Sequence, residues 1–343
     1  MLLLAALLAL HLQPVSPPAP NRQPQLAAAN GTVALVFGSG DSIWLSLSRD
    51  NGRTFSPPAK VADVPSKMAL GRHRGPRVVI TGNTILVSAI DHESGNLSCW
   101  RSTDSGRTWP KTPVVINDKP QAAREGLHAM AADAAGHVAA VWLDDRTIPG
   151  KRLWGAFSND SGATWFKNVM LYESPAGTIC ECCHPSLLSL GGGEFAVMWR
   201  NKMDGSRDFY VMRLRDGKPA STAAKQGLGT WKLEACPMDG GGIALSKGEI
   251  LTAWRREKEV YLFEPGKPEV KLAAGQDIAL AANNKGSYTI WSAGKAIEAR
   301  LPGSTSTMRL SDDGAFPALV ALPDGAVLAA WEENGSIATH RLE

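Results

Sequence analysis

Three copies of one eight-residue pattern constrain this chain more than any other feature. Each copy has Ser first, Asp third, Gly fifth, Thr seventh and an aromatic residue last. The copies are Ser48–Phe55, Ser102–Trp109 and Ser158–Trp165, so their starts lie 54 and 56 residues apart. Asp and Gly at these positions suit a tight turn, because the carboxylate accepts turn N–H groups and Gly adopts a positive φ. The steady spacing predicts one large repeated unit with a strand on each side of the turn.

The pattern matches the Asp-box, and the chain resembles a secreted β-propeller of the sialidase superfamily (the BNR-repeat proteins). In such folds the boxes are structural, and turn chemistry already accounts for their carboxylates. The resemblance therefore implies a structural role for the acidic and glycine positions of the three copies, which are Asp50, Gly52, Asp104, Gly106, Asp160 and Gly162. It also implies a glycosidase-like protein that binds or hydrolyses a glycan.

A second repeat continues beyond the boxes. It consists of an apolar strand, a Gly/Asn/Asp turn and a second apolar strand that often ends in Trp. The seven copies are Gln25–Phe37, Pro76–Ala89, Leu127–Trp142, Pro185–Trp199, Met238–Trp254, Asp277–Trp291 and Phe316–Trp331. We therefore predict an all-β propeller of seven four-stranded antiparallel blades, with six blades as the alternative. The regular long period argues against a β-sandwich. The last copy lacks a fourth strand, which we expect Val15–Arg22 to supply.

The N-terminus is typical of an export signal. Leu2–Leu10 is apolar but too short to span a membrane, and a proline-rich stretch follows it. We predict a signal and linker over residues 1–20 and one propeller domain over 21–343; a disordered apolar tail is the alternative. The mature protein would be a periplasmic or extracellular monomer without a membrane span. The net charge of +3, without runs of Lys and Arg, argues against a nucleic-acid partner.

The predicted topology separates two faces. Loops that enter the first strand of a blade, and loops that join strands two and three, lie opposite the boxes, and we expect function on this box-free face. Guanidinium groups bind carboxylates in a bidentate manner, so an acidic glycan is the expected ligand. The candidate ligand-binding arginines are Arg22, Arg77, Arg146, Arg200, Arg207 and Arg255. Among them, Arg22 in Arg22-Gln23-Pro24 matches the Arg-Ile-Pro motif of the family.

Catalysis is less clearly indicated. The resemblance implies a nucleophilic tyrosine at the start of a late first strand, where this chain has Phe316. Hydrolysis by paired carboxylates is the remaining route. The candidate carboxylates are Asp91, Glu125, Asp144 and Asp145, and no spacing selects a pair among them. The sequence thus leaves open whether the protein is an enzyme.

The resemblance does not account for the cysteines. Cys180, Cys182 and Cys183 open the fourth repeat beside His184, and Cys236 opens the fifth. In an exported protein we expect a disulfide between Cys236 and one of the other three. The alternative is a soft metal ion, copper or zinc, held by these thiolates with His184. No other cofactor is expected. A non-hydrolytic metal-binding or redox propeller is therefore the second functional hypothesis.

Overall fold

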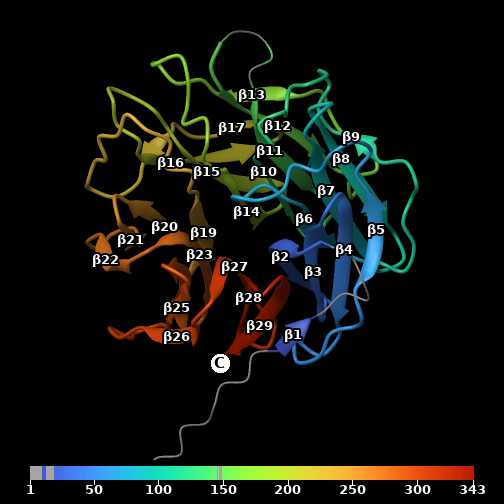
Figure 1. The fold of residues 1–343 in the computed structure, drawn as a ribbon. Helices are drawn as coiled ribbons and strands as arrows, with labels where there is room; N and C mark the ends of the chain where they lie inside the picture. The colour runs from blue at the N-terminus through green and yellow to red at the C-terminus, as the bar shows by residue number, and fades with distance from the viewer. Residues whose placement is uncertain (1–9, 13–18, 145, 147–148) are drawn as a thin grey trace, which may run out of the picture.

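Seven β-sheets surround a central axis (Figure 1). The structure is a computed structural model that describes residues 10–12, 19–144, 146 and 149–343. Every helix or strand assigned within these residues is a β-strand. The same residues contain no helix that is long and apolar enough to cross a membrane. The seven-bladed prediction is confirmed, and the six-bladed and sandwich alternatives are excluded.

Blades one to three follow chain order, with the first strand of each next to the axis. Blade one contains β2 (Asn21–Ala29), β3 (Thr32–Ser39), β4 (Ser42–Ser48) and β5 (Ala59–Asp63). Blade two contains β6 (Arg77–Thr81), β7 (Thr84–Asp91), β8 (Asn96–Ser102) and β9 (Val114–Val115). Blade three contains β10 (His128–Ala132), β11 (Val138–Asp144), β12 (Arg152–Ser158) and β13 (Val169–Tyr172).

Blades four to six repeat this order. Blade four contains β14 (Ser186–Gly191), β15 (Glu194–Arg200), β16 (Phe209–Arg215), β17 (Lys218–Pro219) and β18 (Ala224–Lys225), the last two both pairing with β16. Blade five contains β19 (Gly241–Ser246), β20 (Glu249–Arg256), β21 (Glu259–Phe263) and β22 (Val270–Ala274). Blade six contains β23 (Gln276–Asn283), β24 (Gly286–Ala293), β25 (Ala296–Arg300) and β26 (Met308–Ser311).

The seventh blade joins the two ends of the chain. It contains β27 (Gly314–Ala321), β28 (Val327–Glu333), β29 (Ser336–Leu342) and the N-terminal β1 (Leu10–Leu12). Leu10 pairs with Thr339, and Leu12 pairs with Ile337. An N-terminal strand does complete the ring, but the prediction that Val15–Arg22 supplies it is wrong. Residues 13–18 lie outside the described chain, and Asn21 and Arg22 already belong to β2.

The core lies between blades, which explains the Trp-terminated strands of the sequence. The second strand of a blade is covered on both faces, so its residues are apolar without alternation; every residue of β3, β7 and β11 is buried. Trp142, Trp199, Trp291 and Trp331 are fully buried at or near the ends of such strands. The first strands β2, β6, β10, β14, β19, β23 and β27 contact one another in sequence around the axis.

Candidate functional site

The three boxes form the same self-contained turn. In the first, Asp50 Oδ1 accepts hydrogen bonds from the Thr54 N–H at 2.9 Å and from the Ser48 hydroxyl at 2.7 Å. Asp50 Oδ2 accepts the Thr54 hydroxyl at 2.6 Å, and Gly52 has φ of +77°. The copies at Asp104 and Asp160 repeat these contacts, with Gly106 and Gly162 at φ of +85° and +74°. Hydrogen bonds within the turns therefore explain the presence of all three aspartates.

Hydrogen bonding inside these turns stabilises the ionised carboxylates. The Thr164 hydroxyl and N–H lower the pKa of Asp160 to about 2. The equivalent bonds from Thr54 and Thr108 hold the pKa of Asp50 and Asp104 well below the ordinary value. All three carboxylates therefore remain charged at neutral pH and are occupied by their own turns.

On the opposite face, the first strands begin with an unusual backbone. Gln23, Asp277 and Phe316 have φ of +57°, +56° and +50°, and each lies at a bulge between the first two strands of its blade. His73 and Met238, just before two other first strands, also have positive φ. Left-handed non-glycine residues and bulges concentrate where a fold aims a side chain at a particular place. Two of these residues, His73 and Asp277, line a pocket at the axis.

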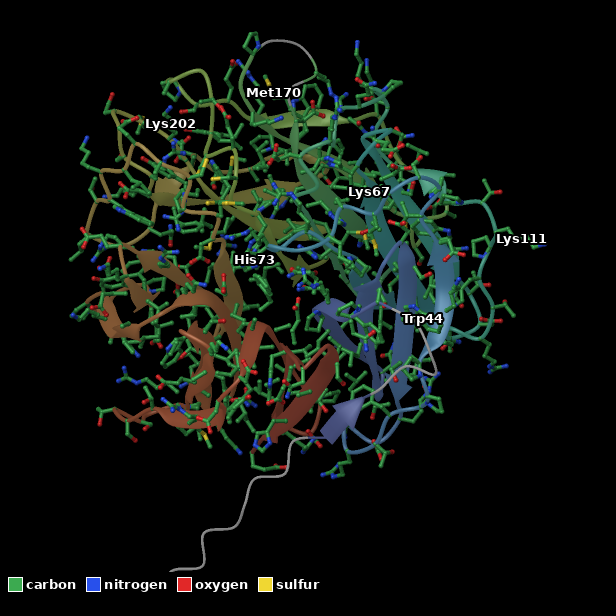
Figure 2. The ribbon with its side chains drawn as sticks, viewed as in Figure 1. Trp44, Lys67, His73, Lys111, Met170 and Lys202 are labelled. Carbon is green, nitrogen blue, oxygen red and sulfur yellow. The ribbon has the colours of Figure 1, made fainter. Side chains whose placement is uncertain are left out.

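A cluster of His and Asp side chains lies at this end of the axis. His73, near the centre of the ring in Figure 2, contacts Asp277 through Nε2 at 2.7 Å from Oδ1. The His184 ring lies 4.5 Å from the His73 ring, centroid to centroid. Asp239 completes a group with His73 and Asp277 whose ligand atoms all lie within 4.8 Å of one another. A Cβ on Gly240 would lie 1.9 Å from the His184 ring, so glycine makes room for that ring.

Burial governs the charges of this cluster. It raises the pKa of Asp239, and the neighbouring Asp277 carboxylate adds to that effect. Burial also lowers the pKa of His184 well below its ordinary value, with His73 contributing, so the His184 imidazole is neutral at pH 7. The buried His184 Nδ1 has no hydrogen-bond partner within the described residues. The cluster is thus a compact, largely desolvated polar group.

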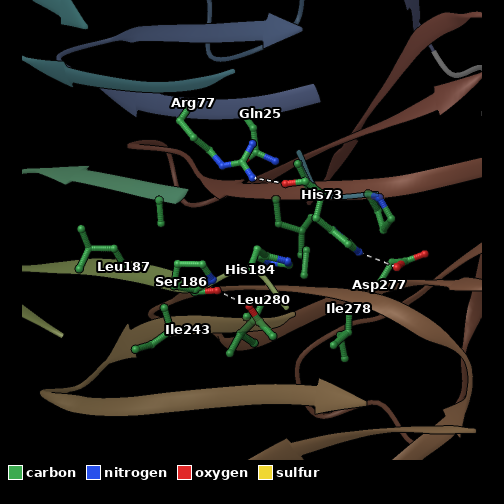
Figure 3. Close-up of a pocket in the computed structure, with 18 of the residues that line it drawn as sticks. Gln25, His73, Arg77, His184, Ser186, Leu187, Ile243, Asp277, Ile278 and Leu280 are labelled. Atoms are coloured by element: carbon green, nitrogen blue, oxygen red, sulfur yellow. Dashed lines mark hydrogen bonds and ion pairs between the residues drawn. The ribbon is translucent and has the colours of Figure 1, made fainter. Parts of the chain in front are cut away.

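The axial pocket, of about 210 Å³, lies beside this cluster. Residues of all seven first-strand regions line it, and its polar side chains include Gln25, His73, Arg77, His184 and Asp277 (Figure 3). Ligand pockets for drug-sized molecules usually hold roughly 300–1,000 Å³. The axial pocket is therefore suited to a small group only.

The position that the resemblance assigns to a nucleophilic tyrosine does face this cluster. Phe316 packs edge-on against His73, with ring centroids 5.3 Å apart. Phenylalanine has no hydroxyl to act as a nucleophile, and none of the four tyrosines lines the axial pocket. The geometry therefore provides no group for catalysis by a tyrosine nucleophile at this pocket.

Three of the six predicted arginines hold the fold together. Arg77 is buried and donates to the carbonyls of His73, Gly75, Pro76 and His128 at 2.6–3.2 Å. The buried Arg200 donates to the carbonyls of Arg207 and Arg255. Arg207 donates to the Leu233 carbonyl and, at 3.2 Å, to Cys180 Sγ. Their guanidinium groups are engaged by the protein itself.

The other three arginines lie apart from one another. Arg22 is exposed and close to Gly71. Arg255 donates to the Glu257 carbonyl and lies 3.5 Å from Asp239 Oδ2. Arg146 donates to Asp144 at 2.8 and 2.9 Å and also contacts Asp118. Arg200 is linked to Arg207 and Arg255 through their main-chain carbonyls, whereas the other three candidates have separate contacts. The structure does not gather the six guanidinium groups into one carboxylate clamp.

The predicted catalytic carboxylates are also dispersed. Asp91 is buried and accepts the N–H groups of Ser66, Glu93 and Ser94. Asp144 is fully buried and accepts the Trp142 indole N–H at 2.7 Å as well as Arg146. Glu125 is half-buried and accepts Arg74 at 2.7 Å. Asp145 lies outside the described residues. No pair of the described candidates faces a common pocket.

A second pocket on the box-free face has a clear charge. This rim pocket, of about 480 Å³, lies between blades two and three and is lined by His92, Lys119, Arg124, Glu125, Arg146 and Lys151 among others. Four permanent cations face one carboxylate among its described lining residues. Lys119 and Arg124 are exposed, and neither side chain has a hydrogen bond or ion pair within the described part of the chain. Two cations are therefore free for a ligand.

The cysteines separate into a trio and two single residues. Cys180, Cys182 and Cys183 are buried with their sulfurs within 4.8 Å of one another, whereas Cys236 is exposed and Cys99 is buried elsewhere. All five are free thiols in the structure. The expected disulfide from Cys236 to the trio is not formed here and stays a prediction.

The sequence predicts function on this face but does not select all of the residues that meet there. It points to His184 and the cysteines, but not to Asp239, Asp277, Lys119 or Lys151, as site residues. The available signal was position: Asp239 and Asp277 come just before or at the start of β19 and β23. Only the ring geometry brings Asp277 next to His73, which lies 204 residues away in the sequence.

Comparison of the sequence with protein-family models and with curated proteins finds no match. Solved structures share the fold. The GH93 α-L-arabinofuranosidase of Fusarium graminearum, in complex with arabinobiose, has a TM-score of 0.58 at 13% identity over 98% of this chain and 97% of its own. The ulvan lyase of family PL25, bound to -[GlcA(1-4)Rha3S]-, scores 0.57 at 9% identity over 98% and 96%.

A Hadza microbial sialidase has a TM-score of 0.51 at 16% identity. The match covers 94% of this chain and 66% of the sialidase, so this chain spans a little under two thirds of that protein. At these identities the likeness establishes the fold alone. The shared fold agrees with the propeller that the repeats predict.

Proposed function

We propose that this propeller binds an acidic glycan at the rim pocket between blades two and three. The observation that carries the proposal is the charge of that pocket, whose described lining has four cations, Lys119, Arg124, Arg146 and Lys151, and one carboxylate, Glu125. Its volume of about 480 Å³ lies in the range of small-molecule sites. Lys119 and Arg124 are exposed without ion-pair partners in the described chain, so they can meet a ligand carboxylate or sulfate without breaking an existing contact.

The other charged residues of the pocket are held in place by ion pairs within the protein. Arg146 is fixed by Asp144 and Asp118 and lies over the Trp154 ring, with its guanidinium carbon 4.0 Å from the ring centroid. Arg74 and Lys151 both approach Glu125, at 2.7 and 3.8 Å. These pairs hold the walls of the site, while Lys119 and Arg124 supply the free positive charge.

Binding fits this geometry better than hydrolysis does. Hydrolysis by two carboxylates needs a pair of carboxyl groups across one site, and the described lining of the rim pocket has one. Beside the axial pocket, Phe316 packs against His73 at the position that the resemblance assigns to a tyrosine nucleophile. Fold neighbours that act on sugars, including the lyase bound to a GlcA-containing chain, support a carbohydrate as the ligand class.

The test compares a glucuronic-acid oligosaccharide with the same oligosaccharide after reduction of its carboxyl groups. We expect calorimetry to show binding of the acidic oligosaccharide only. This binding should weaken as the salt concentration rises, because salt screens the charges. The double change Lys119→Gln/Arg124→Gln should weaken binding about ten-fold. Each exposed charge should contribute somewhat less than 1 kcal/mol to the binding free energy, and the double variant loses two of them. Lys111→Gln, at the edge of the ring in Figure 2, is the matched control and should change nothing. Equal binding of the two oligosaccharides, or an unaffected double variant, would refute the proposal.

A further inference from the structure

The three buried cysteines of blade four form a site that glycan binding does not use. Cys180 Sγ lies 3.5 Å from Cys183 Sγ and 3.9 Å from Cys182 Sγ, and the three sulfurs are all within 4.8 Å of one another. Three thiolates around one ion at the usual metal–sulfur length of about 2.3 Å would lie about 4 Å apart. The trio therefore already has the spacing of a three-sulfur metal site.

The surroundings of the trio are unusual for cysteines that only fill space. Arg207 Nη1 donates to Cys180 Sγ at 3.2 Å, and the Cys180 N–H is fixed by the Arg200 carbonyl at 3.0 Å. Met238, from the loop that enters blade five, packs against the cluster of three cysteines. A buried cation aimed at a sulfur stabilises a thiolate, whereas a purely apolar cavity would favour the neutral thiol. The site thus combines soft ligands with charge compensation.

Access to the site is through one cysteine. Cys180 and Cys183 are each 1% exposed, and Cys182 is 8% exposed. Hydrogen bonding with Cys182 and Cys183 lowers the pKa of Cys180, and the charges of Arg200 and Arg207 add to that effect.

We propose that Cys180, Cys182 and Cys183 bind a single copper(I) ion as three thiolates. Thiolate and thioether ligands select copper(I) and zinc among biological metals. Structural zinc is almost always four-coordinate, and the group of ionisable metal ligands within the described residues ends at three. One copper(I) with three thiolates carries a net charge of −2, which the guanidinium groups of Arg200 and Arg207 balance. Binding releases the protons that the three thiols still hold and moves no electron.

The first experiment is a titration of the full chain. Protein is purified with reductant, freed of metal by a chelator and titrated anaerobically with copper(I) held in its coloured bicinchoninate complex. We expect one equivalent to be withdrawn from the dye. Cys182→Ser should lose this binding, whereas the matched controls Cys99→Ser, buried elsewhere, and Cys236→Ser, exposed, should retain it. Thermal melting of each variant shows whether it folds.

The second experiment needs no variant. Native protein with and without copper(I) is alkylated and analysed by mass spectrometry, and we expect the ion to protect Cys180, Cys182 and Cys183 but not Cys236. Failure to withdraw copper(I), or loss of binding on Cys236→Ser, would overturn the inference. So would stoichiometric zinc binding without copper(I), or a stable disulfide within the trio in anaerobically handled protein. None of these outcomes depends on a sugar, so they leave glycan binding to be judged separately.

Discussion

The two faces of this ring use the same residue types in opposite ways. On the box face, each aspartate is satisfied by its own turn, as Asp50 is by Ser48 and Thr54, and neighbouring blades need not contribute. On the box-free face, His73 meets Asp277 across the axis and Arg74 meets Glu125 from the adjacent blade. A repeat can copy a local turn from blade to blade. A site made by several blades depends instead on residues that differ between the copies.

The difference extends to the sign of the pKa shifts. Local hydrogen bonds lower the pKa of the box aspartates, whereas burial raises that of Asp239. The box carboxylates therefore stabilise the fold as anions, while charge on Asp239 opposes folding. One face contributes stability at neutral pH, and the other retains a destabilising group where ligands or ions can act.

The largest contrast should come from arginines on the two faces. Arg77→Leu leaves the carbonyls of His73, Gly75, Pro76 and His128 without their donor inside the protein. Unsatisfied buried groups cost about 1–3 kcal/mol each, so with partial relaxation we expect a loss of about 4 kcal/mol. Arg107→Leu, on the exposed box turn, should stay within about 0.5 kcal/mol. Urea unfolding of both variants measures this, and a small effect for Arg77→Leu would return that residue to the list of ligand-binding candidates.

Glycines test whether box turns are also interblade contacts. A Cβ on Gly162 would lie 2.1 Å from Leu86 Cδ2 in blade two, whereas a Cβ on Gly31 would meet nothing within 4 Å. Their φ values are similar, at +74° and +72°. Gly31→Ala should cost about 1 kcal/mol for its backbone alone, and Gly162→Ala about 2–3 kcal/mol. Equal shifts in melting temperature would show that the box glycine serves only its own turn.

Two aspartate changes should give the smallest effects, with opposite signs. Asp160 has a folded pKa of about 2, below its unfolded value, so its stabilisation is present above about pH 4 and is lost as pH falls toward 2. Asp160→Asn should therefore cost up to about 1 kcal/mol at pH 7, since this site is exposed to solvent. Asp239 has a raised folded pKa, so stability falls as pH rises through it.

Asp239→Asn should accordingly stabilise the protein at pH 7 by up to about 1 kcal/mol and have little effect in acid. Unfolding curves at pH 4 and pH 7 for both variants provide the measurement. If both substitutions changed stability in the same direction at neutral pH, the electrostatic contrast between the two faces would be wrong.

The sequence predicts the ring well because the ring is repetitive. Trp199 and Trp331 mark strand ends that the structure confirms, and the Asp-boxes form the expected turns. The site was less predictable because it depends on long-range geometry. Arg77 and Arg200 were placed on the correct face, but their burial and their carbonyl partners follow from packing between blades. The residue types of Asp277 and Phe316 also do not predict their left-handed backbone conformation.

The strand β1, which pairs with β29, lies within the segment that the sequence predicts to be an export signal. Three residue pairs, Leu10 with Thr339 through Leu12 with Ile337, cover the outer edge of the last blade. Cleavage of an export signal at the end of the proline-rich stretch would remove that cover. The seven-residue β29 would then present unpaired N–H and C=O groups, which readily accept another strand. Signal cleavage would in that case expose an unpaired strand edge, and the processed protein would need a strand from a partner or from a second copy to pair with it.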